Sequence, residues 1–153
     1  MSPDWKAKPP SDDAGYLDRL SRSLFTAGLS WGMVEKKWPN FRKSFQGFDV
    51  KVVAKFGERD VTRLMKDTGI VRNERKVRAT IYNAKQFLLI REEHGSFRKY
   101  LDSFAKDEKA ALDAISERFQ HVGPSTARMF MWSVAYPLTP TAEEKKWLSG
   151  HNA

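Results

Sequence analysis

Hydrophobic residues recur at every third or fourth position along most of the chain, which is the spacing of helices that bury one face. No long segment shows the alternation of hydrophobic and polar residues that is typical of a half-buried strand. We therefore predict an all-α protein. Buried helical faces are expected in residues 16–27, 30–38, 50–56, 61–65, 77–89, 97–104, 111–119 and 125–134.

Residues at the ends of these segments predict where several helices begin and end. Asp49, Asp60 and Asn73 each precede a hydrophobic stripe, and their side chains can accept a hydrogen bond from a backbone N–H of the first turn. Gly28 is expected to end or bend the first helix. Pro39 has no backbone N–H, so we expect the second helix to stop there and a separate short element to follow.

The length and the hydrophobic content favour a single domain. A chain of 153 residues with 41% hydrophobic residues can bury a core without disulfides or metals. We expect residues 13–138 to form one helical domain. The proline-rich residues 1–12 are expected to form a mobile N-terminal arm, and residues 139–153 a C-terminal tail in which a short helix can form.

Composition narrows the partners and the chemistry. Lys and Arg outnumber Asp and Glu by 27 to 19, and the net charge of +8 favours binding to polyanions such as nucleic acids. The absence of cysteine excludes disulfides, thiolate catalysis and cysteine zinc sites. We expect a monomeric cytoplasmic protein without membrane association, metal or cofactor, because no apolar run is long enough for a membrane span and the three histidines are scattered.

The run from Gly69 to Arg78 combines cations with hydrophobic residues. Arg72, Arg75 and Lys76 stand at the predicted start of a long helix whose other side supplies core residues. Such a segment can build a core with one face and meet an anion with its first turn. The alternative is an ordinary solvated helix face.

Two glycine corners are candidates for contact with DNA. In the segment 121–127, Gly123 allows close approach to a phosphate, and the backbone around Val122, Ser125 and Thr126 can present N–H groups, as in a helix-hairpin-helix. The alternative is an ordinary tight helical corner. In the segment 26–31, Leu29 can wedge into a base stack after Gly28, and Trp31 can stack on an extruded base. Both of these side chains suit a protein core equally well.

Several separated blocks resemble one family, the DNA-3-methyladenine glycosylase I enzymes of bacterial base-excision repair, which belong to the helix-hairpin-helix superfamily. The resemblance runs from about Tyr16 to Leu138. The matching blocks are Ala27-Gly28-Leu29-Ser30-Trp31, Phe41-Arg42 with Phe45, Phe48-Asp49, Asp60-Val61 with Arg63-Leu64, Asp67, Gly69-Ile70-Val71-Arg72-Asn73 with Lys76, Asn83-Ala84, Val122-Gly123-Pro124 and Phe130-Met131.

The resemblance implies a single-domain helical bundle with a helix-hairpin-helix and an enzyme that acts on double-stranded DNA. Such an enzyme flips an alkylated adenine out of the duplex and hydrolyses its N-glycosidic bond. Trp31 and position 23 then belong to the base pocket, and Gly28 and Leu29 to the turn that fills the gap in the stack. Residues 122–126 correspond to the hairpin that grips phosphates.

The sequence departs from this family at two sites. A glutamate usually stands four residues before the alanine of the Ala-Gly-Leu-Ser-Trp block, and this chain has Ser23 there. The family's structural zinc site is missing because there is no cysteine, and Leu138-Thr139-Pro140 replaces an Asn-Asp-His. Glu35, Glu143 and Glu144 could supply a carboxylate, but surface roles are expected for all three.

Three functions therefore remain open from the sequence. The first is a DNA N-glycosylase for alkylated purines with a reduced pocket, in which the catalytic residue is unknown. The second is a catalytically degenerate helix-hairpin-helix protein that only binds DNA. The third is an interaction protein that retains only the helical scaffold, because a fold does not determine a function.

Overall fold

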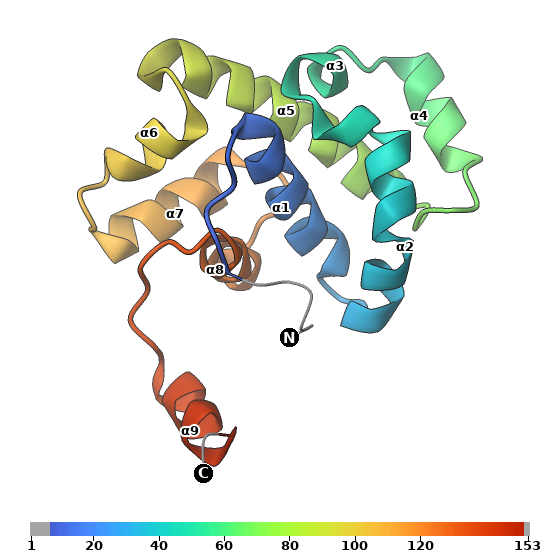
Figure 1. Ribbon diagram of the computed structural model, residues 1–153. Coiled ribbons are helices and arrows are strands. Elements are labelled where there is room, and N and C mark those ends of the chain that lie inside the picture. The colour runs from blue at the N-terminus through green and yellow to red at the C-terminus, as the bar shows by residue number, and fades with distance from the viewer. Residues whose placement is uncertain (1–6, 152–153) are drawn as a thin grey trace.

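The computed structural model describes the backbone of residues 7–151 and the side chains of residues 7–146. The described backbone is all helical and contains no strand, which confirms the predicted fold class (Figure 1). The elements are α1 (Asp13–Thr26), α2 (Trp31–Ser44), the 3-10 turn η1 (Gln46–Phe48), α3 (Val50–Ala54), α4 (Glu58–Met65), α5 (Glu74–His94), α6 (Phe97–Asp102), α7 (Glu108–Arg118), α8 (Pro124–Ser133) and α9 (Ala142–His151).

Side-chain caps fix the starts of several helices. Asp49 accepts from the backbone N–H of Val52 at 3.1 Å, and Asn73 accepts from that of Lys76 at 3.1 Å, as predicted. Asp60 does not cap a helix beginning at Val61. Helix α4 starts three residues earlier, at Glu58, and the Asp60 carboxylate accepts from the N–H of Gly57 at 3.0 Å.

The prediction that the second helix stops at Pro39 is wrong. Helix α2 continues through Pro39 to Ser44. Pro39 is exposed, whereas Trp38 before it and Phe41 after it are buried on the inner face. Tertiary packing of these aromatic rings overrides the loss of one backbone hydrogen bond. Phe41 therefore belongs to α2, and the separate element is only the short turn η1.

An aromatic cluster fills the core between α1, α2 and η1. The rings of Trp38 and Phe48 stack with centroids 5.4 Å apart, and those of Phe25 and Phe41 are 4.7 Å apart. The buried Asp18 carboxylate crosses from α1 to α2, where it accepts from Trp38 Nε1 at 3.2 Å and from Arg42 Nε at 2.8 Å. These two bonds satisfy a carboxylate that would be costly to bury alone.

A second aromatic cluster joins the later helices to the long central helix α5. Phe87 of α5 stacks on Phe97 of α6 with centroids 4.4 Å apart, and Phe119 and Phe130 pack against Phe97 from the segments around α8. Helix α5 packs against α1, α3, α4 and α6, and α8 packs against α1 and α7. Figure 1 shows α5 running behind α1. The core is therefore continuous across residues that span most of the chain.

The chain ends differ in their attachment. Residues 7–12 of the predicted arm precede α1, and the N–H of Lys8 donates to the carbonyl oxygen of Ser133, the last residue of α8, at 3.4 Å. Residues 1–6 of that arm lie outside the described residues. At the other end, α9 projects from the rest of the molecule on an extended segment (Figure 1). No helix in the described part of the chain is long and apolar enough to cross a membrane.

Candidate nucleic-acid interface

The first corner is the turn Thr26–Trp31 between α1 and α2. Gly28 has a φ of 80°, which other residues rarely adopt, and the N–H of Leu29 donates to the carbonyl of Thr26 at 2.8 Å. Ser30 caps α2 by accepting from the N–H of Met33 at 3.2 Å. Leu29 is 37% exposed, so it lies on the surface rather than in the core. The turn therefore presents an apolar side chain to solvent.

Trp31 and Ser23 stand close to this corner in the fold, on different helices. Trp31 is the first residue of α2 and is half-buried, which leaves part of the indole accessible. Ser23 is fully buried on α1, one turn before Ala27, and its Oγ donates to the carbonyl of Arg19 at 3.0 Å. The Ser23 hydroxyl thus already has a backbone partner and carries no charge.

Sequence reasoning missed a buried cation beside Ser23. Arg22 is buried, and its guanidinium carbon lies 5.8 Å from the centroid of the Trp38 ring. Burial lowers the pKa of Arg22, whereas the carboxylates of Asp18 and Glu35 act to raise it. Glu35, expected on the surface, is half-buried on the side of α2 that faces α1. The one signal in the sequence was the i, i+4 spacing of Asp18 and Arg22.

The cations of the basic segment have different roles. Arg72 and Arg75 are exposed around the start of α5. Arg78 is bound to carboxylates, since it donates to Glu58 at 2.8 and 3.0 Å. Lys76 is half-buried, and its Nζ donates to the carbonyls of Ala27 at 2.7 Å and Phe25 at 3.3 Å. The Lys76 ammonium therefore binds the end of α1, and burial lowers its pKa.

The second corner is the turn between α7 and α8. Gly123 precedes α8, Pro124 is its first residue, and Ser125 is exposed in the first turn. The positive φ of this turn, 57°, belongs to His121 and not to Gly123. A Cβ at Gly123 would meet nothing within 4 Å, so its backbone is open to approach.

The side chains of Val122 and Thr126 are buried beside this second corner. Of the predicted hairpin residues, these two can therefore offer only their backbone to a ligand. The first-turn N–H groups of a helix have no acceptor within the helix. At this corner, the exposed groups are therefore the backbone around Gly123 and the Ser125 hydroxyl.

Both corners are attached to the same side of α5. Lys76 holds the first corner, and Asn83 holds the second: its Oδ1 accepts from the N–H of Gln120 at 2.9 Å, and its Nδ2 donates to the Gln120 carbonyl at 3.3 Å. The seven positions from Lys76 to Asn83 correspond to nearly two full turns of an α-helix, or about 10.5 Å. The two corners therefore meet α5 on one face, about two turns apart.

Comparisons with known proteins identify the family of this chain. The model of the methyladenine glycosylase family matches residues 3–134. The chain belongs to the methyladenine glycosylase family. DNA-3-methyladenine glycosylase 1 of Escherichia coli strain K12 is 34% identical over 106 residues, which are 69% of this chain and 57% of that protein. This chain thus spans less than two thirds of the Escherichia coli protein.

Two further relatives are matched over a larger share of their own length. DNA-3-methyladenine glycosylase of Haemophilus influenzae strain Rd is 28% identical over 147 residues, which are 83% of this chain and 80% of that protein. A crystal structure of 3-methyladenine DNA glycosylase I matches with a TM-score of 0.73 and 29% identity, over 84% of this chain and 82% of that chain. The resemblance found in the sequence and the predicted fold are confirmed.

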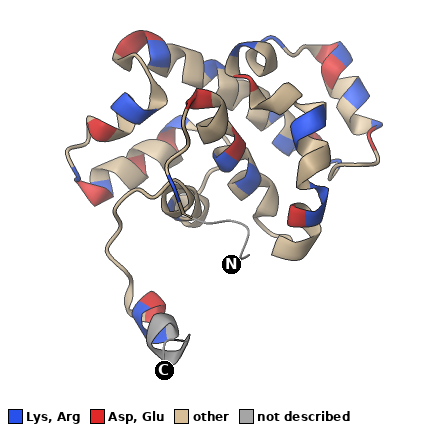
Figure 2. Ribbon diagram, viewed as in Figure 1, with Lys and Arg blue, Asp and Glu red and all other residues tan. Residues whose placement is uncertain are grey.

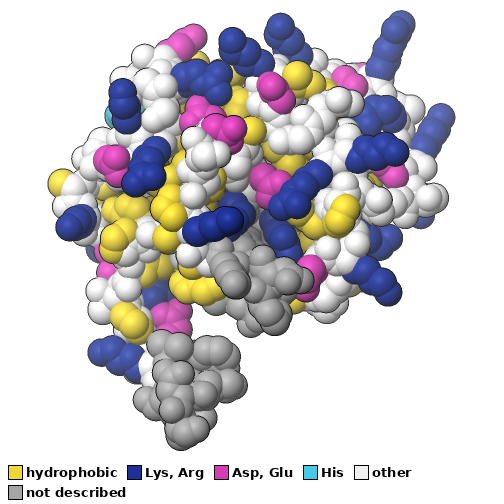
Figure 3. All heavy atoms as spheres, in the orientation of Figure 1, with side chains coloured by type: hydrophobic (Ala, Val, Ile, Leu, Met, Phe, Trp, Pro, Cys, Tyr) yellow, Lys and Arg dark blue, Asp and Glu magenta, His cyan; other side chains and the backbone are white. Residues whose placement is uncertain are grey.

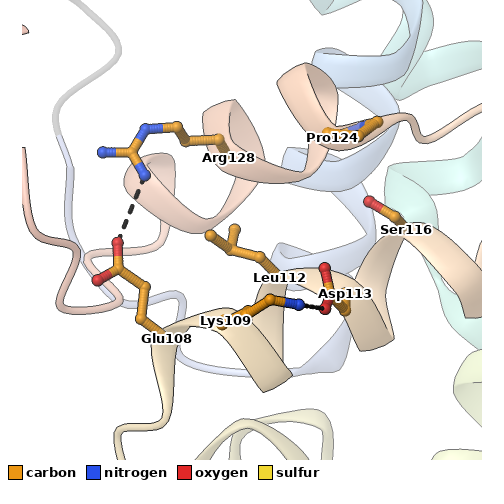
Figure 4. Close-up of a pocket in the computed structure, with 7 residues that line it drawn as sticks. All are labelled: Glu108, Lys109, Leu112, Asp113, Ser116, Pro124 and Arg128. Carbon is orange, nitrogen blue, oxygen red and sulfur yellow. Dashed lines mark hydrogen bonds and ion pairs between the residues drawn. The ribbon is translucent and has the colours of Figure 1, made fainter. Parts of the chain in front are cut away.

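Two cavities of this methyladenine glycosylase family member lie away from both attachments to α5. One of about 370 Å³ lies between α7 and α8, where Leu112 faces Arg128 and where Arg128 pairs with Glu108 and Lys109 with Asp113 (Figure 4). These pairs balance its charge. The other, of about 350 Å³, is lined by residues 8–11, Gly15, Asp18, Arg19 and Arg42. In the part of the chain that the structure describes, no group of His, Asp and Glu could hold a metal ion.

On the face seen in Figures 2 and 3, positive and negative side chains of the described residues are mixed. Figure 2 shows Lys and Arg on nearly every helix of the body, interspersed with Asp and Glu. The same mixture covers the face seen in Figure 3, with several hydrophobic side chains exposed towards its lower left.

Proposed function

We propose that this protein is a DNA N-glycosylase that binds double-stranded DNA through both corners and excises alkylated adenine. The observation that carries the proposal is the attachment of both corners to one side of α5, in a chain that the family model covers from residue 3 to residue 134. The names of the relatives, which are DNA-3-methyladenine glycosylases, support the same activity.

Once the base is flipped out of the duplex, its removal needs little catalysis, because an alkylated base is a good leaving group. Alkylation at N3 gives adenine a positive charge. The base leaves as a neutral molecule with the electron pair of its bond to the sugar, while water adds to the sugar carbon and releases one proton to solvent. Leu29 would fill the gap in the base stack, and the accessible part of Trp31 would stack on the extruded base. Gly123 and Ser125 would hold a backbone phosphate.

An excision assay tests this proposal. Purified protein is incubated with methylated duplex DNA, and the free bases are separated by chromatography. We expect release of 3-methyladenine above the level found with heat-denatured protein. No release at micromolar protein concentration would refute the proposed activity.

A second candidate function is DNA binding without excision. The observation that favours it is Ser23, a buried neutral side chain whose hydroxyl already donates to a backbone carbonyl. This function predicts affinity for duplex DNA that falls steeply with salt, without base release. Protein that shows no salt-dependent binding to duplex DNA would contradict both candidates.

We further propose that the protein acts as a monomer in the cytoplasm. A single helical unit that carries both corners needs no second copy to form the interface. Light scattering of the purified protein measures its mass in solution, and a dimer mass would refute the first statement. Fractionation of cells that express the protein tests the cytoplasmic location.

A further inference from the structure

We propose that Lys76 and Asn83 are positioning residues, which fix the two corners about two helical turns apart so that both engage the same short stretch of DNA. The inference rests on the proposed function for its role on DNA. The attachment of the first corner itself can be tested without DNA.

Lys76 is built to hold a backbone segment. Its ammonium is half-buried and donates to the carbonyls of Ala27 and Phe25 at 2.7 and 3.3 Å. These carbonyls lie at the C-terminal end of α1, where the helix dipole favours a cation. Ala27 is followed directly by Gly28, whose φ is 80°, and by the exposed Leu29. The cation therefore fixes the backbone from which the exposed corner departs.

Asn83 performs the corresponding task for the second corner. It is 1% exposed, and both ends of its amide bind the backbone of Gln120. Such paired bonds set the direction of the chain as well as its distance. The next residue, His121, has a φ of 57°, and the hairpin with Gly123 follows. Loss of Asn83 would remove the side-chain partner of both the N–H and the carbonyl of Gln120.

The spacing of the two residues sets how far apart the two corners are attached along α5. Seven residues of α5 correspond to about 10.5 Å. At 3.4 Å per base pair, this distance is about three base pairs of B-form DNA. Thr80, which lies between them, is fully buried, and α5 runs without interruption. The helix thus acts as a rigid spacer between the corner with Leu29 and the hairpin.

Hydrogen exchange tests the attachment of the first corner. The N–H of Leu29 donates to the Thr26 carbonyl at 2.8 Å, so its exchange reports the order of that turn. We expect Lys76→Met to raise its exchange rate at least tenfold. The matched control Lys85→Met removes an exposed cation of the same helix and should leave that rate unchanged, as should Asn83→Ala at the other corner. Equal exchange rates in Lys76→Met and Lys85→Met would overturn the proposal.

The salt dependence of DNA binding separates positioning from direct contact. A lysine that contacts a phosphate contributes about 0.9 to the slope of log affinity against log salt. We expect Arg72→Met to reduce the slope by about this amount and Lys76→Met to leave it unchanged. A slope reduced equally by both variants would overturn the positioning role, because Lys76 would then be a phosphate contact.

Excision rates test the coupling to the corner. We expect Lys76→Met to lower the single-turnover rate about tenfold, because small misplacements in a reacting complex are costly. Lys76→Arg keeps a cation for the same carbonyls and should restore most of the rate.

Double variants test whether Lys76 acts through the corner that carries Leu29. The effects of Lys76→Met and Leu29→Ala on the excision rate should be non-additive, whereas those of Asn83→Ala and Leu29→Ala should add. Additive effects for the first pair would overturn the proposal. If the wild type releases no base, the proposed function fails, and hydrogen exchange still decides the attachment.

Discussion

At the residue scale, the unusual feature is the group of buried polar side chains on α1. Asp18, Arg22 and Ser23 are all buried. A charged group is buried only where other charges or hydrogen bonds compensate it, and Asp18 and Glu35 provide this for Arg22. Residue type alone would place an arginine in solvent. Such conflicts between residue type and location are typical of functional sites.

The neutral serine at position 23, where the resemblance implies a glutamate, gives a prediction for a single residue. Under the proposed function, position 23 belongs to the base pocket, so Ser23→Glu would supply a carboxylate to pair with a cationic base, and we expect a higher rate of 3-methyladenine release. The measurement is single-turnover excision from methylated duplex DNA. Ser23→Gln, similar in size and neutral, is the control and should give no increase. Thermal unfolding checks that both variants fold. A folded Ser23→Glu protein with an unchanged rate would show that one carboxylate does not make up for the rest of the pocket.

At the element scale, α2 shows how packing competes with local preference. Pro39 lies inside this helix, where a proline removes one hydrogen bond and clashes with the preceding turn. The helix persists because Phe41 packs on Phe25 of α1 and Trp38 packs on Phe48 of η1. Pro39 itself lies on the exposed face of α2, where its ring contributes little burial.

A stability prediction follows for this helix. We expect Pro39→Ala to raise the free energy of unfolding by about 1 to 3 kcal/mol, because alanine restores the missing N–H and favours the helix. Urea denaturation followed by circular dichroism measures this change. Lys43→Ala, an exposed site in the same helix, should change stability by less than about 0.5 kcal/mol. A less stable Pro39→Ala protein would mean that the ring packs favourably in α2.

At the scale of the whole molecule, an ion-pair network attaches the C-terminal segment to the body. Arg128 of α8 donates to Glu144 at 2.6 and 3.0 Å and to the carbonyl of Thr139 at 2.8 Å, and it also reaches Glu108 at 3.4 Å. The hydrogen bonds from Arg128, with those from Thr141, hold the pKa of Glu144 at about 2, below the usual 4.5. These bonds tie the first turn of α9 to α8 through one arginine side chain, while the helix itself projects from the body.

The lowered pKa predicts how this attachment depends on pH. A carboxylate whose pKa is lowered by folding stabilises the attached state fully above its usual pKa and ceases to do so as pH falls through the lowered one. The attachment should therefore weaken between about pH 4.5 and pH 2. Carbon NMR of the Glu144 carboxyl group should give a midpoint near 2, and Arg128→Met should move it towards 4.5. A wild-type midpoint near 4.5 would contradict the network.

The sequence by itself determined the local features of this protein. Hydrophobic spacing identified an all-α chain, and the caps at Asp49 and Asn73 were correct because a cap involves atoms only three residues apart. The ordered blocks identified the family. The roles of Gly28, Leu29 and Gly123 at a DNA surface stay predictions, although the structure places Leu29 and Gly123 where solvent reaches them.

Only the tertiary structure decided which polar groups meet across the fold. The sequence predicts that Lys76 meets an anion or stands on a solvated helix face, yet its ammonium binds carbonyls 49 and 51 positions away. Asn83 binds a residue 37 positions away. Arg22 of α1 is likewise buried beside Glu35, which belongs to another helix. The physical cause is that helix formation depends on neighbours within a few residues, whereas the pairing of a polar side chain depends on which distant helices close over it.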